Sequence, residues 1–211
     1  MSLHSRTDYQ RGQLDHSAMS DGPWKLLELW VEEAVNSGIS DPTAFTLTSL
    51  DSRGFPHGRI VLLRDTRQNE LVFFTNYLSE KGKDLERHPK AGAVFFWPHF
   101  ERQIRVRGTV QRIPENESDA YFASRPRGSQ LGAWSSNQSQ EITSRQNLED
   151  QYNSRETEFE GAEVTRPPHW GGYALSPELI EFWQGRPSRM HDRLVCRLQE
   201  DDSWSVVRLQ P

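Results

Sequence analysis

Hydrophobic residues in this chain recur first at a helical spacing and then, over most of its length, in short runs typical of strands. Leu27, Trp30, Val31, Ala34 and Val35 follow the spacing of one helix face, which predicts a helix over residues 24–36. Further helices are predicted over residues 79–87, 115–124 and 142–160. Strands are predicted over residues 44–50, 59–64, 71–75, 91–97, 103–113, 172–175, 179–183, 194–198 and 204–209.

The clearest strand pattern lies in residues 103–113, where Ile104, Val106, Gly108 and Val110 alternate with polar side chains. Residues 51–54 (Asp-Ser-Arg-Gly) are typical of a hairpin turn between two strands. Many short strands joined by turns predict a mainly β (α+β) fold, an antiparallel β-barrel with attached helices. We expect one domain over residues 23–211, preceded by a mobile polar arm over residues 1–22.

Composition narrows the classes of protein to consider. The formal net charge of −5 argues against bulk affinity for nucleic acid or an anionic membrane. The longest apolar run, residues 93–97, is far too short for a membrane span, and residues 1–22 lack a stretch of signal-peptide type. The single cysteine, Cys196, allows no internal disulfide, so a cytoplasmic location is the simplest expectation. Only 34% of the residues are hydrophobic, which favours extra burial in a subunit interface.

Several familiar catalytic and nucleotide-binding patterns are missing from the sequence. There is no G-x-G-x-x-G after a strand, no phosphate-binding loop of the G-x-x-x-x-G-K-[ST] type and no G-x-S-x-G elbow. The seven histidines are scattered, and none pairs with another at the spacing of metal ligands. We therefore expect no metal site, and no dinucleotide bound by these devices.

Arginine, lysine and glutamine placed among apolar runs are the first candidates for chemistry. Arg59 and Arg64 bracket four apolar residues, and an arginine beside a buried strand needs a protein carboxylate or a ligand phosphate. Both could instead be charges on the rim of the barrel. Lys81 lies where a helix capped by Ser79 begins, a place that favours anions, although an ordinary capped surface helix has the same pattern. Gln103 could hydrogen-bond the edge of a flavin or a base, or end a solvated strand.

Two denser groups of polar residues follow. Tyr121, Arg125 and Ser129 are four positions apart, so one helix would align three phosphate donors. Because Pro126 makes an unbroken helix improbable, a loop followed by a helix would have to bring them together. The second group, residues 189–193 (Arg-Met-His-Asp-Arg), follows an aromatic strand and a glycine turn. It has the composition of a site, or of a salt-bridge cluster around Asp192.

Seven stretches of the chain, in this order, are similar to those of the pyridoxamine 5′-phosphate oxidases, a family of homodimeric split-barrel flavoproteins. The similarity runs from about residue 41 to residue 211 and, more loosely, through residues 6–9. The stretches are residues 59–63 (RIVLL), 73–76 (FFTN), 101–103 (ERQ), 124–127 (SRPR), 129–134 (SQLGAW), 181–185 (EFWQG) and 189–193 (RMHDR). No single stretch is specific, but the ordered set is.

The resemblance implies a homodimer with FMN at the interface. The enzyme would oxidise pyridoxine or pyridoxamine 5′-phosphate to pyridoxal 5′-phosphate and reduce O₂ to H₂O₂. The positions that match FMN contacts are Arg59, Ile60, Val61, Leu62, Leu63, Arg64, Phe74, Thr75, Lys81, Gln103, Gln138, Ser139, Trp183 and Arg193. Those that match substrate contacts are Arg6, Tyr9, Arg64, Tyr121, Arg125, Ser129, Arg189 and His191, of which Arg189 and His191 are the expected catalytic pair.

Two residues depart from the family's pattern, and two other functions remain open. Arg64 stands where the family has a lysine at the substrate phosphate, and Glu80 stands where it has a basic residue. Arginine keeps the charge of lysine but binds with a different geometry, whereas a carboxylate near the flavin phosphate would be repulsive unless it points away. The alternatives are a split-barrel oxidase of another aromatic compound, such as a phenazine precursor, and a barrel that binds flavin or haem without catalysis.

Overall fold

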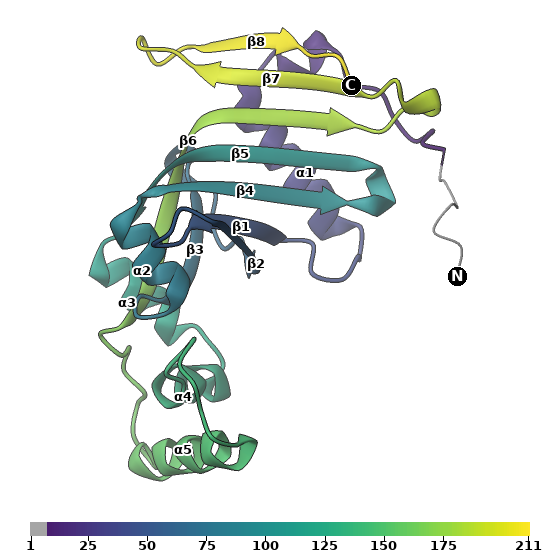
Figure 1. The fold of residues 1–211 in the computed structure, drawn as a ribbon. Coiled ribbons are helices and arrows are strands. Elements are labelled where there is room, and N and C mark those ends of the chain that lie inside the picture. Colours follow the sequence, from purple (N-terminus) through teal and green to yellow (C-terminus); the bar gives the residue numbers. More distant parts are fainter. Residues whose placement is uncertain (1–7) are drawn as a thin grey trace.

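The computed structural model describes residues 8–211, whose centre is an antiparallel sheet of eight strands curled into a barrel (Figure 1). The strands are β1 (Ala44–Leu50), β2 (Pro56–Leu62), β3 (Leu71–Asn76), β4 (Lys90–Trp97), β5 (Arg102–Arg112), β6 (Trp170–Gln184), β7 (Asp192–Leu198) and β8 (Trp204–Arg208). The α-helices are α1 (Gly22–Asn36), α2 (Glu80–Arg87), α3 (Glu115–Ala123), α4 (Arg127–Ser135) and α5 (Arg145–Glu158). The predicted antiparallel barrel with attached helices is confirmed.

The sheet follows the strand order β2-β1-β4-β5-β6-β7-β8, and β3 pairs with the first half of β6. The circle closes at a short bridge: the Arg64 backbone N–H donates to the Val72 carbonyl at 2.8 Å, and the Val72 N–H donates to the Asp65 carbonyl at 2.9 Å. The strands β1–β6 therefore form the barrel, while β7 and β8 extend the sheet beyond it. This short bridge places the end of β2 beside β3, and a cavity is lined by residues of both strands.

The predicted strands over residues 172–175 and 179–183 are wrong as separate elements, because both belong to the single strand β6. Ser176 and Pro177 suggested a break, but the pairing of β5 with β6 only shifts register there, between Arg107 and Gly108. Proline lacks a backbone donor and is tolerated at such a bulge. Gly108 is required at this point, since a Cβ atom on it would lie 2.0 Å from the Ser176 carbonyl oxygen.

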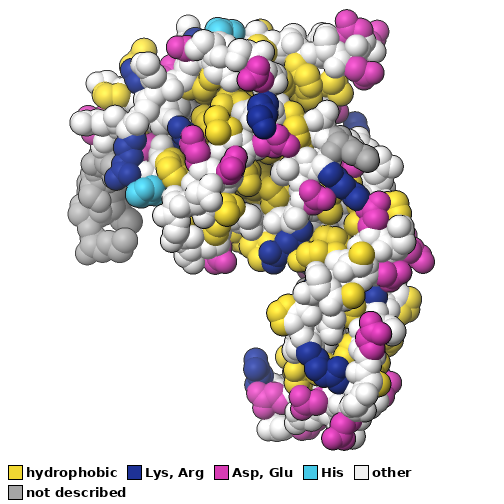
Figure 2. Space-filling view, turned by 180° about the vertical axis from the view of Figure 1, so that it is seen from behind, with side chains coloured by type: hydrophobic (Ala, Val, Ile, Leu, Met, Phe, Trp, Pro, Cys, Tyr) yellow, Lys and Arg dark blue, Asp and Glu magenta, His cyan; other side chains and the backbone are white. Residues whose placement is uncertain are grey.

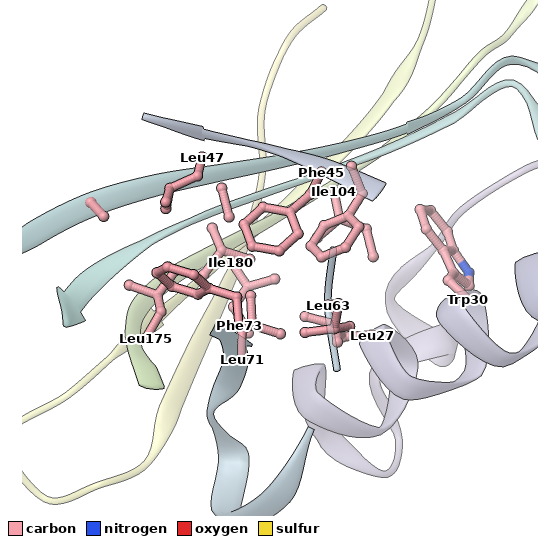
Figure 3. Packing of buried hydrophobic residues seen from close by; sticks show 14 of the residues in the cluster. Leu27, Trp30, Phe45, Leu47, Leu63, Leu71, Phe73, Ile104, Leu175 and Ile180 are labelled. Carbon is pink, nitrogen blue, oxygen red and sulfur yellow. The ribbon is translucent and has the colours of Figure 1, made fainter. Parts of the chain in front are cut away.

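The main hydrophobic core fills the barrel and the space under α1 (Figure 3). Alternating side chains of β1 and β5 point into it, as their sequence pattern predicts, and Phe45, Leu47 and Ile104 are almost completely buried. The helix α1 contributes Leu27 and Trp30, whose ring packs edge-on against Phe182 at 5.3 Å. A helix with one apolar face thus seals the barrel on one side.

The helix α3 lies beside α2 at the end of the barrel, and α4 and α5 project away from it (Figure 1). The bounds of the short helix α4 were not predicted, and α5 is shorter than the predicted helix over residues 142–160. Figure 2 shows positive and negative side chains interspersed over the face seen from behind. None of the helices within residues 8–211 is long and apolar enough to cross a membrane.

The described part of the predicted arm, residues 8–21, packs along the sheet. Leu14 is only 3% exposed, and residues 16–19 form a short 3₁₀-helix capped by the Asp15 side chain. The mobility expected for residues 1–22 stays a prediction.

The bulge between β5 and β6 gives a test of the fold. We expect Gly108→Ala to lower the free energy of unfolding by about 1–3 kcal/mol, because its methyl group would collide with the backbone at Ser176. Gly92→Ala on the neighbouring strand β4 is the matched control, since its Cβ atom would find no heavy atom nearer than 3.8 Å. Urea denaturation of both variants makes the comparison, and equal stabilities would contradict the required close approach.

Candidate active site

A cavity of about 520 Å³ lies where β2 and β3 meet the helices α2, α3 and α4. It brings together two predicted groups of residues that lie far apart in the sequence. The predicted residues that line it are Arg59, Ile60, Val61, Leu62, Arg64, Phe74, Thr75, Lys81, Tyr121, Arg125, Ser129 and Gln138. Leu63 is buried in the main core instead, since neighbouring residues of an extended chain point to opposite sides. Ser139 is exposed near the cavity and does not line it.

Arg59 is held at the cavity by a buried polar network. Its Nη1 donates to the Ser49 hydroxyl at 2.7 Å, and that hydroxyl donates to Asp84 Oδ2 at 2.8 Å. Arg59 thus has the carboxylate partner that its place beside a strand requires, yet its buried Nη2 has no hydrogen-bond partner among residues 8–211. Burial lowers the pKa of Arg59, while the charges of Asp84 and Glu80 oppose that shift. The guanidinium keeps unused capacity for a ligand's anionic group.

Lys81 adds a second cation beside Arg59. It lies in the first turn of α2, whose cap Ser79 accepts from the Gly82 backbone N–H at 3.3 Å, as predicted. Its Nζ donates to Gln138 Oε1 at 3.0 Å, and the Thr75 hydroxyl donates to the same oxygen at 3.3 Å. Burial lowers the pKa of Lys81, and the charge of Arg59 lowers it further, whereas Glu80 raises it. An anion bound here would relieve the repulsion between these two cations.

A third cation, Arg125, lines the cavity beside an aromatic cluster. Its guanidinium carbon is 4.5 Å from the centre of the Trp170 ring, and its buried Nη1 has no hydrogen-bond partner among the described residues. Burial lowers the pKa of Arg125; Tyr121 raises it, and the charge of Arg64 lowers it. Tyr121 stacks on Phe74 at 3.9 Å between ring centres. The cavity is therefore cationic at two places, with flat aromatic surfaces nearby.

The arrangement of Tyr121, Arg125 and Ser129 confirms a loop followed by a helix rather than one continuous helix. The helix α3 ends at Ala123, and Pro126 caps the start of α4. Tyr121 therefore projects from α3, Arg125 from the connection and Ser129 from the first turn of α4, and all three line the cavity.

The remaining predicted residues lie at the far end of β6, away from the cavity. Gln103 pairs with Trp183 across β5 and β6, and Trp183 pairs with Arg193 across β6 and β7. The His191 ring is 4.7 Å from that of Trp183, and the Tyr9 ring contacts both, at 5.7 and 5.6 Å. Burial lowers the pKa of His191, and the charge of Arg189 lowers it further. Arg6 lies outside the described residues.

A salt bridge between Arg189 and Asp192, the structural alternative considered for residues 189–193, is not found. Asp192 pairs instead with Arg208 at 2.7 Å and with Arg186 at 3.6 Å. Arg193 pairs with the buried Glu181 at 2.8 Å. Arg189 is exposed and has a left-handed backbone, with φ of +61°. The cluster therefore contains ion pairs, but Arg189 is not the partner of Asp192.

Sequence reasoning missed several residues around the cavity. Ser49 and Asp84 hold Arg59, and Trp170 lies under Arg125. Ser49 carried a signal, because it occupies an inward position after Phe45 and Leu47 in an alternating strand, where a polar side chain needs a buried partner. The other missed residues that line the cavity are Asn76, Gly132, Ala133 and Ser136. Among residues 8–211 there is no group of three or more His, Cys, Asp or Glu placed to hold a metal ion.

Comparisons with known proteins agree with this fold and cavity. Residues 31–157 match the family model described as pyridoxamine 5′-phosphate oxidase, and residues 170–211 match the model described as the pyridoxine 5′-phosphate oxidase C-terminal dimerisation region. Two curated relatives, both named pyridoxine/pyridoxamine 5′-phosphate oxidase, come from Microcystis aeruginosa, at 50% identity, and from Cyanothece sp. PCC 7425, at 48%. Each alignment covers 98% of this chain and 96% of the relative.

Solved structures give the same picture. The chain is similar to PhzG from Burkholderia lata in complex with tetrahydrophenazine-1-carboxylic acid, with a TM-score of 0.87 and 26% identity, covering 96% of this chain and 100% of that one. An FMN-binding protein from Nostoc punctiforme, described as related to pyridoxamine 5′-phosphate oxidase, shares the fold, with a TM-score of 0.72 and 18% identity over 92% of this chain and 100% of that one.

The fold defines a split barrel with a cationic cavity where β2 and β3 meet. The chain belongs to the pyridoxamine 5′-phosphate oxidase family, as the match to its model and the identity to its curated members show. The family binds FMN, so the resemblance given by the seven stretches and the expected cofactor are confirmed.

The surroundings of His191 predict its charge state. We expect a neutral imidazole at pH 7, because burial and the cation of Arg189 both disfavour the protonated form. Arg189→Gln should raise the pKa of His191 without restoring its usual value of about 6.5, because burial is the larger cause. NMR titration of the ring protons measures the shift, with the exposed Arg197→Gln as control. An unchanged pKa in Arg189→Gln would show that the two charges do not interact.

Proposed function

We propose that this chain is an FMN-dependent oxidase that converts pyridoxine 5′-phosphate and pyridoxamine 5′-phosphate to pyridoxal 5′-phosphate. O₂ would be reduced to H₂O₂, and the amine substrate would also consume water and release ammonia. The observation that carries the proposal is one cavity lined by two pairs of neighbouring cations, Arg59 with Lys81 and Arg64 with Arg125, and by the stacked rings of Phe74 and Tyr121. Two phosphate-bearing aromatic molecules need such a site. The names of the curated relatives support the same reaction.

The residues at the first cationic place fit the phosphate of FMN. The buried Nη2 of Arg59 has no hydrogen-bond partner among residues 8–211, and Lys81 lies in the first turn of α2, where backbone amides also favour an anion. Thr75 and Gln138 lie beside Lys81, linked to each other by a hydrogen bond. Arg59, Lys81, Thr75 and Gln138 would hold FMN, which would supply the redox chemistry of the two-electron oxidation, with O₂ as the final acceptor. The protein's own contribution is to position both molecules and to keep their phosphates apart.

The second cationic place fits the phosphate of the substrate. Arg125 and Arg64 supply charge, while the hydroxyl groups of Tyr121 and Ser129 supply hydrogen-bond donors. Trp170 supports the Arg125 guanidinium from below, so its planar face is already oriented before a ligand binds. An arginine at position 64 can bind a phosphate through two parallel hydrogen bonds, which a lysine cannot do.

The residues expected at the substrate ring, Arg189 and His191, would come from a second subunit. In one chain they follow the last residues of β6, whereas Trp170 at the cavity is the first residue of the same strand. The fourteen residues from Trp170 to Trp183 span roughly 40 Å along an extended strand. Residues 170–211 match a dimerisation region and contain Trp183, Arg189, His191 and Arg193. A homodimer whose second subunit presents these residues would complete each site, with Arg193 and Gln103 at the flavin and Arg189 and His191 orienting the ring.

Oxidation of a phenazine precursor is the second candidate function, because PhzG has the same fold over the whole chain. The grip formed by Arg125, Tyr121 and Ser129 favours a phosphorylated substrate instead. A barrel that only binds flavin or haem is the third candidate, and it would give Arg189 and His191 no role. Steady production of H₂O₂ by the purified, FMN-loaded protein with pyridoxine 5′-phosphate, and not with a phenazine precursor, separates the three.

The phosphate grip can be tested at Arg125. We expect Arg125→Ala to lower kcat/KM for pyridoxine 5′-phosphate by about tenfold to a hundredfold, because a charge-assisted hydrogen bond is worth roughly 1.5–3 kcal/mol. Activity on pyridoxine, which lacks the phosphate, should change little. Arg145→Ala, at an exposed ion pair on α5, is the control. An equal loss on both substrates would mean that Arg125 does not bind the phosphate.

Sharing of the site between subunits can be tested by complementation. Arg125→Ala and Arg189→Ala should each keep about a tenth of the wild-type activity or less, but a hybrid dimer would contain one site in which both residues are intact. Equal mixing by unfolding and refolding should therefore restore about a quarter of the wild-type activity, since half of the dimers are hybrids. Refolded samples of each variant alone are the controls. Activity no higher than theirs would place both residues in the site of one chain.

A further inference from the structure

Residues 8–14, here called the N-terminal strap, lie across the end of the sheet where the loop 186–191 follows β6. The strap is not loosely attached, because Leu14 inserts into the main core and is 3% exposed. Its backbone groups form hydrogen bonds with the side chains of Glu101, Asp192 and Arg208. Two of these partners, Glu101 and Asp192, are carboxylates, and the proposed function assigned neither a role.

Glu101 binds the strap through two backbone groups. Its Oε2 accepts from the Gln10 N–H at 2.8 Å and from the Arg11 N–H at 2.9 Å, and the residue is only 7% exposed. A buried carboxylate needs such partners, and charge-assisted hydrogen bonds are among the stronger ones. The Glu101 backbone is left-handed, with φ of +54°, and its carbonyl accepts from the Gly185 N–H at 2.7 Å. Glu101 therefore joins the strap to the end of β6.

Asp192 holds the other end of the strap. Its Oδ2 accepts from the Leu14 N–H at 3.1 Å, and the two arginines that pair with it also bind the strap. Arg186 donates to the Gly12 carbonyl at 2.7 Å, and Arg208 donates to the Leu14 carbonyl at 2.9 Å. Asp192, Arg186 and Arg208 thus all bind the backbone of the strap. The carboxylate of Asp192 pairs with these two arginines and not with Arg189.

The strap in turn contacts the loop that carries Arg189 and His191. Asp8 Oδ1 accepts from the Ser188 N–H at 3.3 Å, and the Tyr9 ring packs on His191. A Cβ atom on Gly185 would lie 2.7 Å from the Tyr9 ring, so glycine is required for this approach. Ser188 and Arg189 both have left-handed backbones, with φ of +54° and +61°. Two such residues in succession are costly without glycine and need surrounding contacts to hold them.

We propose that Glu101 and Asp192 are positioning residues: they hold the N-terminal strap by its backbone N–H groups, and the strap holds the loop 186–191 in the conformation that presents Arg189 and His191. The inference rests on the proposed function, in which Arg189 and His191 contact the substrate. Glu101 and Asp192 touch neither substrate nor cofactor. They act through Asp8 and Tyr9.

The test is Glu101→Gln in the full-length, FMN-loaded enzyme. Glutamine keeps the size and one acceptor but loses the charge, so kcat/KM for pyridoxine 5′-phosphate should fall about tenfold with FMN content unchanged. Trypsin should also cut faster after Arg11, because the released strap exposes that bond. Glu178→Gln, at an exposed ion pair on β6, is the matched control. A lowered melting temperature with unchanged kcat/KM and unchanged cleavage would reduce Glu101 to a structural role and overturn the proposal.

A double-mutant cycle with Tyr9→Ala tests whether Glu101 acts through the strap. If it does, Tyr9→Ala should cost little more in the Glu101→Gln background, because the tyrosine has already been displaced. Independent, multiplicative losses would overturn the inference. Should Glu101→Gln fail to fold, Leu14→Ala loosens the strap from its own side and should give the same loss and the same faster cleavage; normal values would refute the role of the strap.

Failure of the strap inference is distinguishable from failure of the proposed function. Unchanged kcat/KM in Arg189→Ala would show that the loop 186–191 has no role in turnover. The proposed role of Arg189 would then fail, and the inference would lose its basis. A large loss in Arg189→Ala together with wild-type kinetics in Glu101→Gln and Leu14→Ala would leave the proposed function intact and overturn only the role of the strap.

Discussion

The length of β6 is the constraint on which the rest of the structure depends. This one strand pairs with β3, β5 and β7, so it joins the barrel to the extension of the sheet. It also carries Trp170 at the cavity and Trp183 beside His191 at its other end. An extended strand cannot bring its two ends together, and the bulge at Gly108 bends it without breaking it. The two halves of the proposed site therefore lie at opposite ends of one strand, and the proposed function relies on a second copy to join them.

The cavity itself is organised by the cost of burying positive charge. Burial lowers the pKa values of Arg59, Lys81 and Arg125, which means that the folded protein holds each cation in surroundings that disfavour its charge. Asp84 compensates Arg59 only in part, and Arg125 has an aromatic face in place of a carboxylate. Such a cavity is stabilised when anions enter it. Glu80, which departs from the family's pattern, reduces the positive potential near Arg59 and Lys81 and should weaken FMN binding rather than prevent it.

The elements predicted correctly from the sequence are those whose structure depends on interactions between residues close together in the chain. The strands β1 and β5 alternate cleanly, Ser79 caps α2, and the turn after β1 uses Gly54 with a positive φ, so these elements followed from the sequence. That β6 is one continuous strand did not follow from the sequence. Pro177 is tolerated within it because Gly108, in the neighbouring strand β5, allows a bulge there. The bounds of α4 did not follow from the sequence, because its two glycines and two serines weaken the helical pattern. Of the site, the motifs indicated most residues that line the cavity, but the Ser49–Asp84 support for Arg59 is a contact between distant segments.

The motif at residues 189–193 shows how neighbouring residues can serve different purposes. Side chains along an extended segment alternate in direction, so His191 and Arg193 cannot share all their surroundings with Asp192. His191 faces Trp183 and Tyr9, Arg193 is held by Glu181, and Asp192 binds Arg186, Arg208 and the backbone of Leu14. The sequence offered a choice between a site and a salt-bridge cluster, and the structure contains the ion pairs without Arg189 among them. An aspartate within such a motif is explained by the segment it fixes, which here lies almost the whole chain length away in sequence.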